Sequence, residues 1–152
     1  MPKVVIIISL YNAKPFLSDL FDSLSRYYGN QSWVTVVAID DCSPDATHDR
    51  VQHDYPWVDL IRTSENSGFA IANNIATEYA LTTYDPEFLF YLNQDTEVEG
   101  GFLEKLVTPL EADHTIGIAQ PLILIHPFSS DIVNTVGKEL SFLGYGYTSF
   151  EG

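Results

Sequence analysis

The chain has 152 residues, of which 45% are hydrophobic and 18% charged, so it can bury the core of one domain and is not disordered. Seven Lys and Arg stand against 21 Asp and Glu, and a formal charge of −14 argues against binding to nucleic acid or anionic lipid. One cysteine allows no internal disulfide, and no apolar run approaches the roughly 20 residues of a membrane span, so we expect a cytoplasmic protein.

Short apolar runs and helical patterns alternate along the first two thirds of the chain. The run at 4–8 is continuous and β-branched, as in a strand buried on both faces, and the apolar residues of 17–24 recur on one helical face. Similar patterns predict strands at 34–39, 58–61, 88–92 and 116–125 and helices at 43–52, 68–81 and 102–110, with Ser43 as an N-cap. This order predicts an α/β fold with a mostly parallel sheet and helices on both faces.

Polar residues follow each of the first four predicted strands. They occupy positions 9–12, 40–43, 65–68 and 93–96, and every group contains a carboxylate or an amide. Asp, Asn and Ser are also common in turns and helix caps, so one such position has little weight. Because the carboxyl ends of parallel strands meet at one sheet edge, where ligands bind, the four groups together favour a functional site.

Other α/β sites lack their sequence signatures here. No glycine precedes Gly29, so the first turn cannot be the glycine-rich loop of a dinucleotide site, and no P-loop sequence occurs. A phospho-acceptor receiver domain would need an acid pair after the first strand and a lysine near the end of the fifth, but Lys138 comes too late. A nucleotidylyltransferase would need a Gly-rich, Arg-containing loop after the first strand, which is also absent.

Four segments resemble glycosyltransferase family 2 in their order and strand context. They read IISLYN at 7–12, VAIDDCSPDAT at 37–47, NSGFAIANN at 66–74 and YLNQDT at 91–96, and the resemblance runs from about residue 3 to 125. It implies the GT-A fold, a nucleotide-diphosphate sugar donor and a divalent cation, Mn²⁺ or Mg²⁺. The family's Asp-x-Asp motif becomes Asn-Gln-Asp here. This form is similar to that of rhamnosyltransferase-like members, which implies dTDP-rhamnose as donor and bacterial polysaccharide assembly.

The resemblance and the chemistry of the side chains predict a set of nucleotide-sugar-binding residues: Ser9, Tyr11, Asp40, Asp41, Asn66, Gly68, Asn74, Asn93 and Asp95. Asp95 matches the last acid of the motif and is the predicted metal ligand, since a cation there would neutralise a diphosphate in this acidic chain. Tyr11 offers a flat face for a pyrimidine base. Asp40 or Asp41 can accept the base N3–H, because Ser43 as the cap leaves one acid spare.

An inverting transfer also needs a general base, which the family places well beyond the metal motif. No acid after Asp95 stands in a matching context, so the catalytic base is not identified, and we expect it to lie beyond Gly152. We therefore expect residues 1–125 to be a donor-binding domain and 126–152 to begin an acceptor-side segment of a longer, truncated enzyme that acts on a saccharide or lipid-linked acceptor.

The expected truncation has consequences for partners and location. The chain alone would bind nucleotide without transferring sugar and would self-associate through apolar residues at 142–147. The full-length enzyme would lie in the cytoplasm, peripheral to the inner face of the membrane. The alternative is a non-catalytic module that binds a nucleotide-sugar or a metal and does not turn the donor over.

Overall fold

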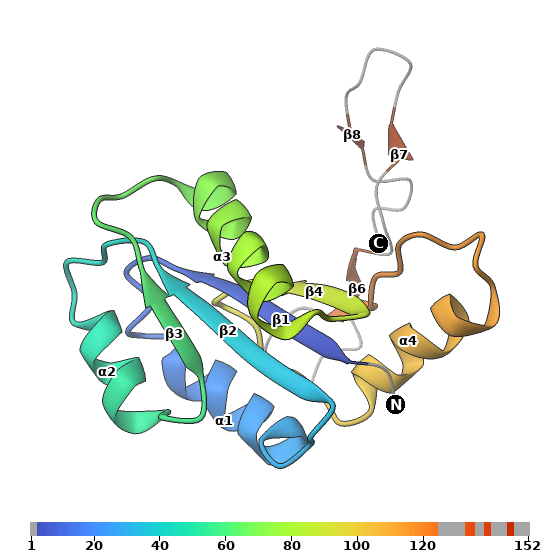
Figure 1. Cartoon of the computed structure of the whole chain (residues 1–152), viewed down its shortest axis with the longest axis horizontal. Helices are drawn as coiled ribbons and strands as arrows, with labels where there is room; N and C mark the ends of the chain where they lie inside the picture. The colour runs from blue at the N-terminus through green and yellow to red at the C-terminus, as the bar shows by residue number, and fades with distance from the viewer. Residues whose placement is uncertain (1–2, 125–132, 136–138, 141–145, 148–152) are drawn as a thin grey trace. The chain divides into compact units, whose positions relative to one another are not determined.

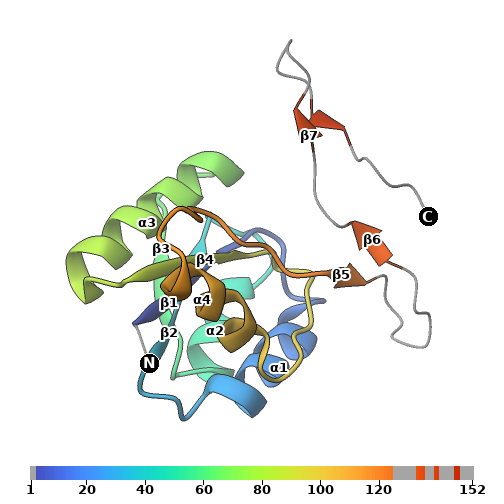
Figure 2. The same cartoon turned by 90° about the vertical axis from the view of Figure 1, so that its right-hand side faces the viewer.

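The computed structural model describes residues 3–124, 133–135, 139–140 and 146–147, and the chain divides into two compact units, 1–100 and 101–152. The first unit contains a four-stranded parallel sheet in the order β3-β2-β1-β4. Its strands are β1 (Val4–Leu10), β2 (Val34–Asp40), β3 (Asp59–Arg62) and β4 (Phe88–Leu92). The connecting helices are α1 (Leu17–Tyr28), α2 (Thr47–Asp54) and α3 (Phe69–Tyr84). Helices α1 and α2 cover one face of the sheet and α3 covers the other (Figures 1 and 2), so the predicted α/β architecture is confirmed.

Strand β1 lies between β2 and β4, and all seven of its residues are buried. A strand in this position has a helix layer on each face, which explains why its sequence is continuously apolar rather than alternating. On the α3 face, alanines spaced four residues apart let the helix approach the sheet closely. The cluster formed there consists of Val5, Ile7, Val37, Ile39, Ala72, Ala76 and Ala80.

The strand order reverses beside β1. The chain moves outward from β1 to β2 and β3, and then returns to the other side of β1 as β4. The last paired residues of β1 and β4 are Ile8 and Leu92. In open parallel sheets such a reversal creates a crevice at the carboxyl ends of the strands, where ligands bind.

The second unit contains α4 (Phe102–Ala112) and two short antiparallel pairs, β5 (Ile123–Leu124) with β6 (Val133–Thr135) and β7 (Glu139–Leu140) with β8 (Gly146–Tyr147). The predicted strand at 116–125 is wrong except for β5, because residues 116–122 form no strand. Pro121 cannot donate to a ladder, and the Ile118 side chain is 89% exposed, so this segment lacks the burial that a sheet strand requires. The predicted self-association region at 142–147 lies outside the described residues, except for the short strand β8.

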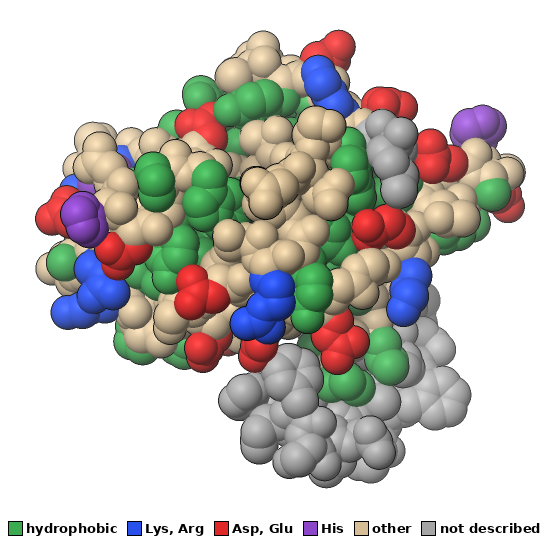
Figure 3. Space-filling view, turned by 90° about the horizontal axis from the view of Figure 1, so that it is seen from below, with side chains coloured by type: hydrophobic (Ala, Val, Ile, Leu, Met, Phe, Trp, Pro, Cys, Tyr) green, Lys and Arg blue, Asp and Glu red, His purple; other side chains and the backbone are tan. Residues whose placement is uncertain are grey.

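Acidic side chains are spread over the face of the molecule seen in Figure 3, among neutral and apolar ones. Lys and Arg side chains lie among them on this face. Among the described helices, none combines the length and the apolar character needed to cross a membrane.

Candidate functional site

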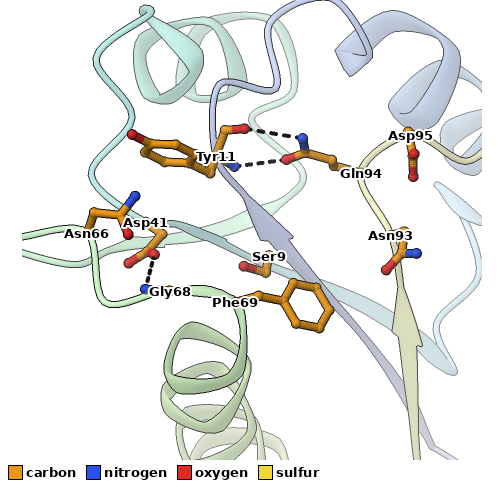
Figure 4. A pocket seen from close by; sticks show the side chains of 9 residues that line it. All are labelled: Ser9, Tyr11, Asp41, Asn66, Gly68, Phe69, Asn93, Gln94 and Asp95. Atoms are coloured by element: carbon orange, nitrogen blue, oxygen red, sulfur yellow. Dashed lines mark hydrogen bonds between the residues drawn. The ribbon is translucent and has the colours of Figure 1, made fainter. Parts of the chain in front are cut away.

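A pocket of about 640 Å³ lies at the carboxyl ends of the strands in the first unit. Its lining comes from the ends of β1, β2 and β4, and from the start of α3 with the loop before it (Figure 4): Ser9, Tyr11, Asp41, Asn66, Gly68, Phe69, Asn93, Gln94 and Asp95. This volume is in the range of about 300–1,000 Å³ that is usual for small-molecule sites. The pocket is therefore where the reversed strand order predicts ligand binding.

Seven of the nine predicted binding residues line this pocket, and Asp40 and Asn74 do not. Asn74 is exposed on α3 and is not among the lining residues. Gln94 and Phe69 line the pocket although the sequence did not single them out. Phe69 is the first residue of α3 and is 67% exposed, which its place in an apolar helical pattern did not indicate.

The general base is expected beyond Gly152, the last residue of this sequence, and therefore stays a prediction. Among the acids that follow the metal motif, Asp113 accepts hydrogen bonds from the N–H and the hydroxyl of Thr115, at 2.9 Å and 2.7 Å. These bonds hold the pKa of Asp113 below its ordinary value. Glu139 begins the short strand β7, and Asp131 lies outside the described residues.

Asp40 is fully buried at the end of β2 and joins it to the end of β3. Its Oδ2 lies 3.0 Å from Nε of Arg62 in an ion pair and 4.0 Å from Nδ1 of His48. Its Oδ1 accepts a hydrogen bond from the backbone N–H of Ser43 at 3.3 Å. Arg62 also donates to the carbonyl oxygen of Ser43 at 3.2 Å. Asp40 is thus engaged within the scaffold and is not a spare acid.

Asp41 organises the wall of the pocket that lies between β3 and α3. Its Oδ1 accepts from the hydroxyls of Thr63 and Ser67 and from the N–H of Ser67, at 2.7–2.9 Å, and its Oδ2 accepts from the N–H of Gly68 at 2.7 Å. Burial alone would raise the pKa of Asp41, but the hydrogen bonds from Ser67, Thr63 and Gly68 outweigh it and hold the pKa below its ordinary value. The carboxylate is therefore ionised at neutral pH, and it fixes residues 63–68.

Gly68 ends this wall in a conformation that other residues rarely adopt. Its φ is 85° and its ψ is 157°, a region that is essentially restricted to glycine. A Cβ built on Gly68 would meet no atom within 4 Å, so the backbone conformation and not crowding by the protein requires glycine here.

The segment after β1 is held by side chains of other loops. Four consecutive backbone N–H groups each donate to such a side chain: Tyr11 to Gln94 Oε1 (2.8 Å), Asn12 to Ser43 Oγ (3.1 Å), Ala13 to Thr47 Oγ1 (2.9 Å) and Lys14 to Asp45 Oδ2 (3.3 Å). Asn12 takes a left-handed φ of 51° within this segment. The loop that carries Tyr11 is therefore fixed in the protein without a ligand.

The predicted N-cap role of Ser43 is wrong. Helix α2 begins four residues later, at Thr47, and its N-cap residue Ala46 makes no side-chain capping hydrogen bond. Instead, the Thr47 N–H is satisfied by Asp45 Oδ1 at 3.2 Å, while the Ser43 hydroxyl accepts from Asn12. Asp45 therefore supplies the local hydrogen bond that was expected from Ser43, and the Ser43 hydroxyl bonds a segment about 30 residues away.

The sequence matches the family model described as glycosyl transferase family 2 over residues 5–129. The chain belongs to glycosyltransferase family 2. It is 32% identical over 108 residues to the putative teichuronic acid biosynthesis glycosyltransferase TuaG of Bacillus subtilis (strain 168), covering 68% of this chain and 40% of that protein. The chain therefore spans about two fifths of the length of this relative.

Solved glycosyltransferase structures have the same fold. The mannosyltransferase PcManGT from Pyrobaculum calidifontis, in complex with GDP-Man and Mn²⁺, superposes with a TM-score of 0.67 at 26% identity, over 76% of this chain and 34% of that one. S. aureus TarS 1–349 in complex with UDP-GlcNAc gives a TM-score of 0.62 at 22% identity, over 79% of this chain and 38% of that one. These likenesses confirm the GT-A fold that the sequence predicted.

The charged side chains that line this family 2 pocket are compatible with a cation bound together with phosphate groups. None of the described residues that line it is Lys or Arg, while Asp41 and Asp95 are acids. The described residues contain no group of three His, Cys, Asp or Glu side chains that would hold a metal unaided. Mg²⁺ and similar ions commonly bind through one or two carboxylates plus substrate phosphates and water. Asp95 and the amide oxygen of Asn93, exposed on one side of the pocket (Figure 4), fit such a site.

Proposed function

We propose that this chain is the donor-binding part of an inverting glycosyltransferase that takes a sugar from a nucleotide-diphosphate donor with the help of a divalent cation. The observation that supports this most strongly is the composition of the pocket. It combines an exposed aromatic ring, amide side chains and Asp95 with no Lys or Arg among its described lining residues. A diphosphate would be repelled from this pocket unless a cation accompanied it.

The base of the nucleotide would bind beside Tyr11, Asp41 and Asn66. The Tyr11 side chain is 43% exposed and offers an aromatic face for stacking. The Asn66 amide provides one donor and one acceptor, which match the carbonyl and N–H at the edge of uracil or thymine. Asp41 keeps acceptor capacity at Oδ2, whose hydrogen bond among the described residues comes from Gly68.

The diphosphate and the sugar would lie toward the β4 side of the pocket. Asp95 and Asn93 would hold Mn²⁺ or Mg²⁺, and the bound cation would stabilise the negative charge of the leaving diphosphate. Phe69, which lines the same pocket as Asn93, offers an apolar ring for the C–H face of the sugar (Figure 4). The structure of PcManGT is a complex with GDP-Man and Mn²⁺, which supports the proposal of a divalent metal for this chain.

The biological assignment also belongs to the proposal. The Asn-Gln-Asp-Thr form of the motif supports a rhamnosyltransferase-like enzyme with dTDP-rhamnose as donor, and the name of TuaG, which refers to teichuronic acid biosynthesis, supports a role in bacterial polysaccharide assembly. We further propose that residues 1–125 bind the donor, that the acceptor is a saccharide or lipid-linked saccharide, and that the enzyme works in the cytoplasm.

Calorimetry of nucleotide binding tests the donor and metal assignments together. The chain should bind UDP, dTDP or GDP at least about tenfold more tightly with Mn²⁺ than without it, since a cation held by Asp95 would offset the repulsion between the diphosphate and this acidic pocket. Asp95→Asn should abolish this gain, and Asp49→Asn, an exposed acid on α2, should retain it. Equal affinities with and without Mn²⁺ would contradict the metal role.

Turnover separates an enzyme from the alternative, a module that only binds. A full-length protein containing this chain should release nucleotide diphosphate from dTDP-rhamnose or another nucleotide-sugar when a saccharide acceptor is added. Tight binding of nucleotide without such release, across a panel of donors and acceptors, would favour the non-catalytic module.

A further inference from the structure

Gln94 joins the segments that follow β1 and β4, beyond the last paired residues of these strands. Its side-chain amide accepts a hydrogen bond from the N–H of Tyr11 at 2.8 Å and donates one to the carbonyl oxygen of Tyr11 at 3.2 Å (Figure 4). A neighbouring strand would satisfy a residue's backbone in the same way, with one donor and one acceptor. A single side chain therefore continues the contact between the two strands after β4 has ended at Leu92.

The position of Gln94 in the motif gives this contact its significance. Gln94 stands between Asn93 and Asp95, the two residues that would hold the cation, and Tyr11 lies on the base side of the pocket. The other loop contacts, from Ser43, Thr47 and Asp45 to residues 12–14, come from the segment after β2. Gln94 thus connects Tyr11 directly to the segment that carries Asp95.

We propose that Gln94 is a positioning residue, which sets Tyr11 at the distance from Asp95 that a nucleoside diphosphate must span. This role rests on the proposed function of the pocket. A loop that is already ordered loses less conformational freedom when the ligand binds, so the two hydrogen bonds between Gln94 and Tyr11 increase affinity beyond what Gln94 contributes as a lining residue of the pocket. The effect should appear in the binding of the whole nucleotide and should depend on Tyr11.

The two hydrogen bonds between Gln94 and Tyr11 predict a graded loss of nucleotide affinity in a series of variants. Glutamate can accept from the Tyr11 N–H, but its second oxygen would face the Tyr11 carbonyl, where no donor would remain. Leucine preserves much of the size and removes both hydrogen bonds. Affinity should therefore fall from Gln94 through Gln94→Glu to Gln94→Leu.

The experiment measures binding of the Mn²⁺ complex of UDP, dTDP or GDP, whichever the wild-type chain binds, by calorimetry. Gln94→Leu should weaken binding by about tenfold, which corresponds to about 1.4 kcal/mol. The affinity of Gln94→Glu should lie between those of the wild type and Gln94→Leu. Gln52→Leu, at an exposed position on α2, should bind as the wild type does. If Gln94→Leu does not fold, as judged by thermal melting, Gln94→Glu carries the comparison.

The same substitution made in a Tyr11→Ala variant distinguishes a positioning role of Gln94 from a general loss of structure. If Gln94 acts through Tyr11, Gln94→Leu should weaken binding by less than about twofold when it is added to Tyr11→Ala. Additive losses, or a Gln94→Leu variant with wild-type affinity, would overturn the proposal and leave the proposed function standing. A wild-type chain that binds none of the three nucleotides would overturn both.

Discussion

Asp40 and Asp41 are adjacent in sequence, yet they serve opposite sides of the sheet. Successive side chains at the end of a strand point to opposite faces. Asp40 accordingly meets Arg62 and Ser43 beside α2, and Asp41 meets Ser67 and Gly68 at the start of α3. Because each carboxylate holds its own loop, a single pair of acids fixes the segments after β2 and β3.

The hydrogen bonds to Asp41 make stability depend on pH. Folding lowers the pKa of Asp41, so its contribution to stability is present above the pKa of an unfolded carboxyl, about 3.9, and is lost as the pH falls through the lower folded pKa. Asp41→Asn should reduce the free energy of unfolding by about 2 kcal/mol at pH 7, because hydrogen bonds to a charged group are lost. This difference should shrink as the pH is lowered below about 4.

Urea denaturation of the wild type and Asp41→Asn measures this difference in the free energy of unfolding. The pH should range from about 3 to about 7, so that it includes the region in which a carboxyl group titrates. Asp19→Asn, at an exposed position on α1, is the control and should change the free energy of unfolding by only a few tenths of a kcal/mol. A destabilisation of Asp41→Asn that is the same at both ends of the range would contradict the role of the ionised carboxylate.

At the scale of elements, the sequence was most informative where burial is continuous. The run at 4–8 in β1 predicts a strand because it is apolar throughout. Ligands bind at the carboxyl ends of parallel strands, and seven of the residues predicted on this basis line one pocket. It was least informative where a loop is held by distant partners. Ser43 caps no helix because it bonds Asn12, and Gln94 bonds Tyr11 across 83 residues, which no local pattern reveals.

The interface between α3 and the sheet gives a prediction at this scale. Ala76 is fully buried in the cluster against β1 and β2, so Ala76→Leu would insert extra atoms into a packed layer. We expect a loss of about 1–3 kcal/mol in the free energy of unfolding, measured by urea denaturation. Ala70→Leu, on the exposed surface of the same helix, should cost little. Equal effects of the two substitutions would mean that α3 is not tightly packed on the sheet.

At the scale of the whole molecule, a formal charge of −14 over 152 residues implies mutual repulsion in the folded state. Salt should weaken this repulsion, because the screening length falls from about 30 Å at 0.01 M to about 8 Å at 0.15 M. The thermal midpoint should therefore rise over this range of NaCl, measured by circular dichroism without divalent ions. A falling midpoint would indicate that ion pairs such as Arg62–Asp40 outweigh the repulsion.

The pairing of β1 with β4 also matters while the protein is being made. Val4 pairs with Phe88, so one edge of the most buried strand has no partner until 84 further residues have left the ribosome. At about 5–20 residues per second, this interval lasts about 4–17 s. During this interval the nascent chain carries an apolar strand with at least one open edge, a surface on which unfinished chains aggregate. The yield of soluble protein should therefore respond to translation speed and chaperone supply before β4 emerges.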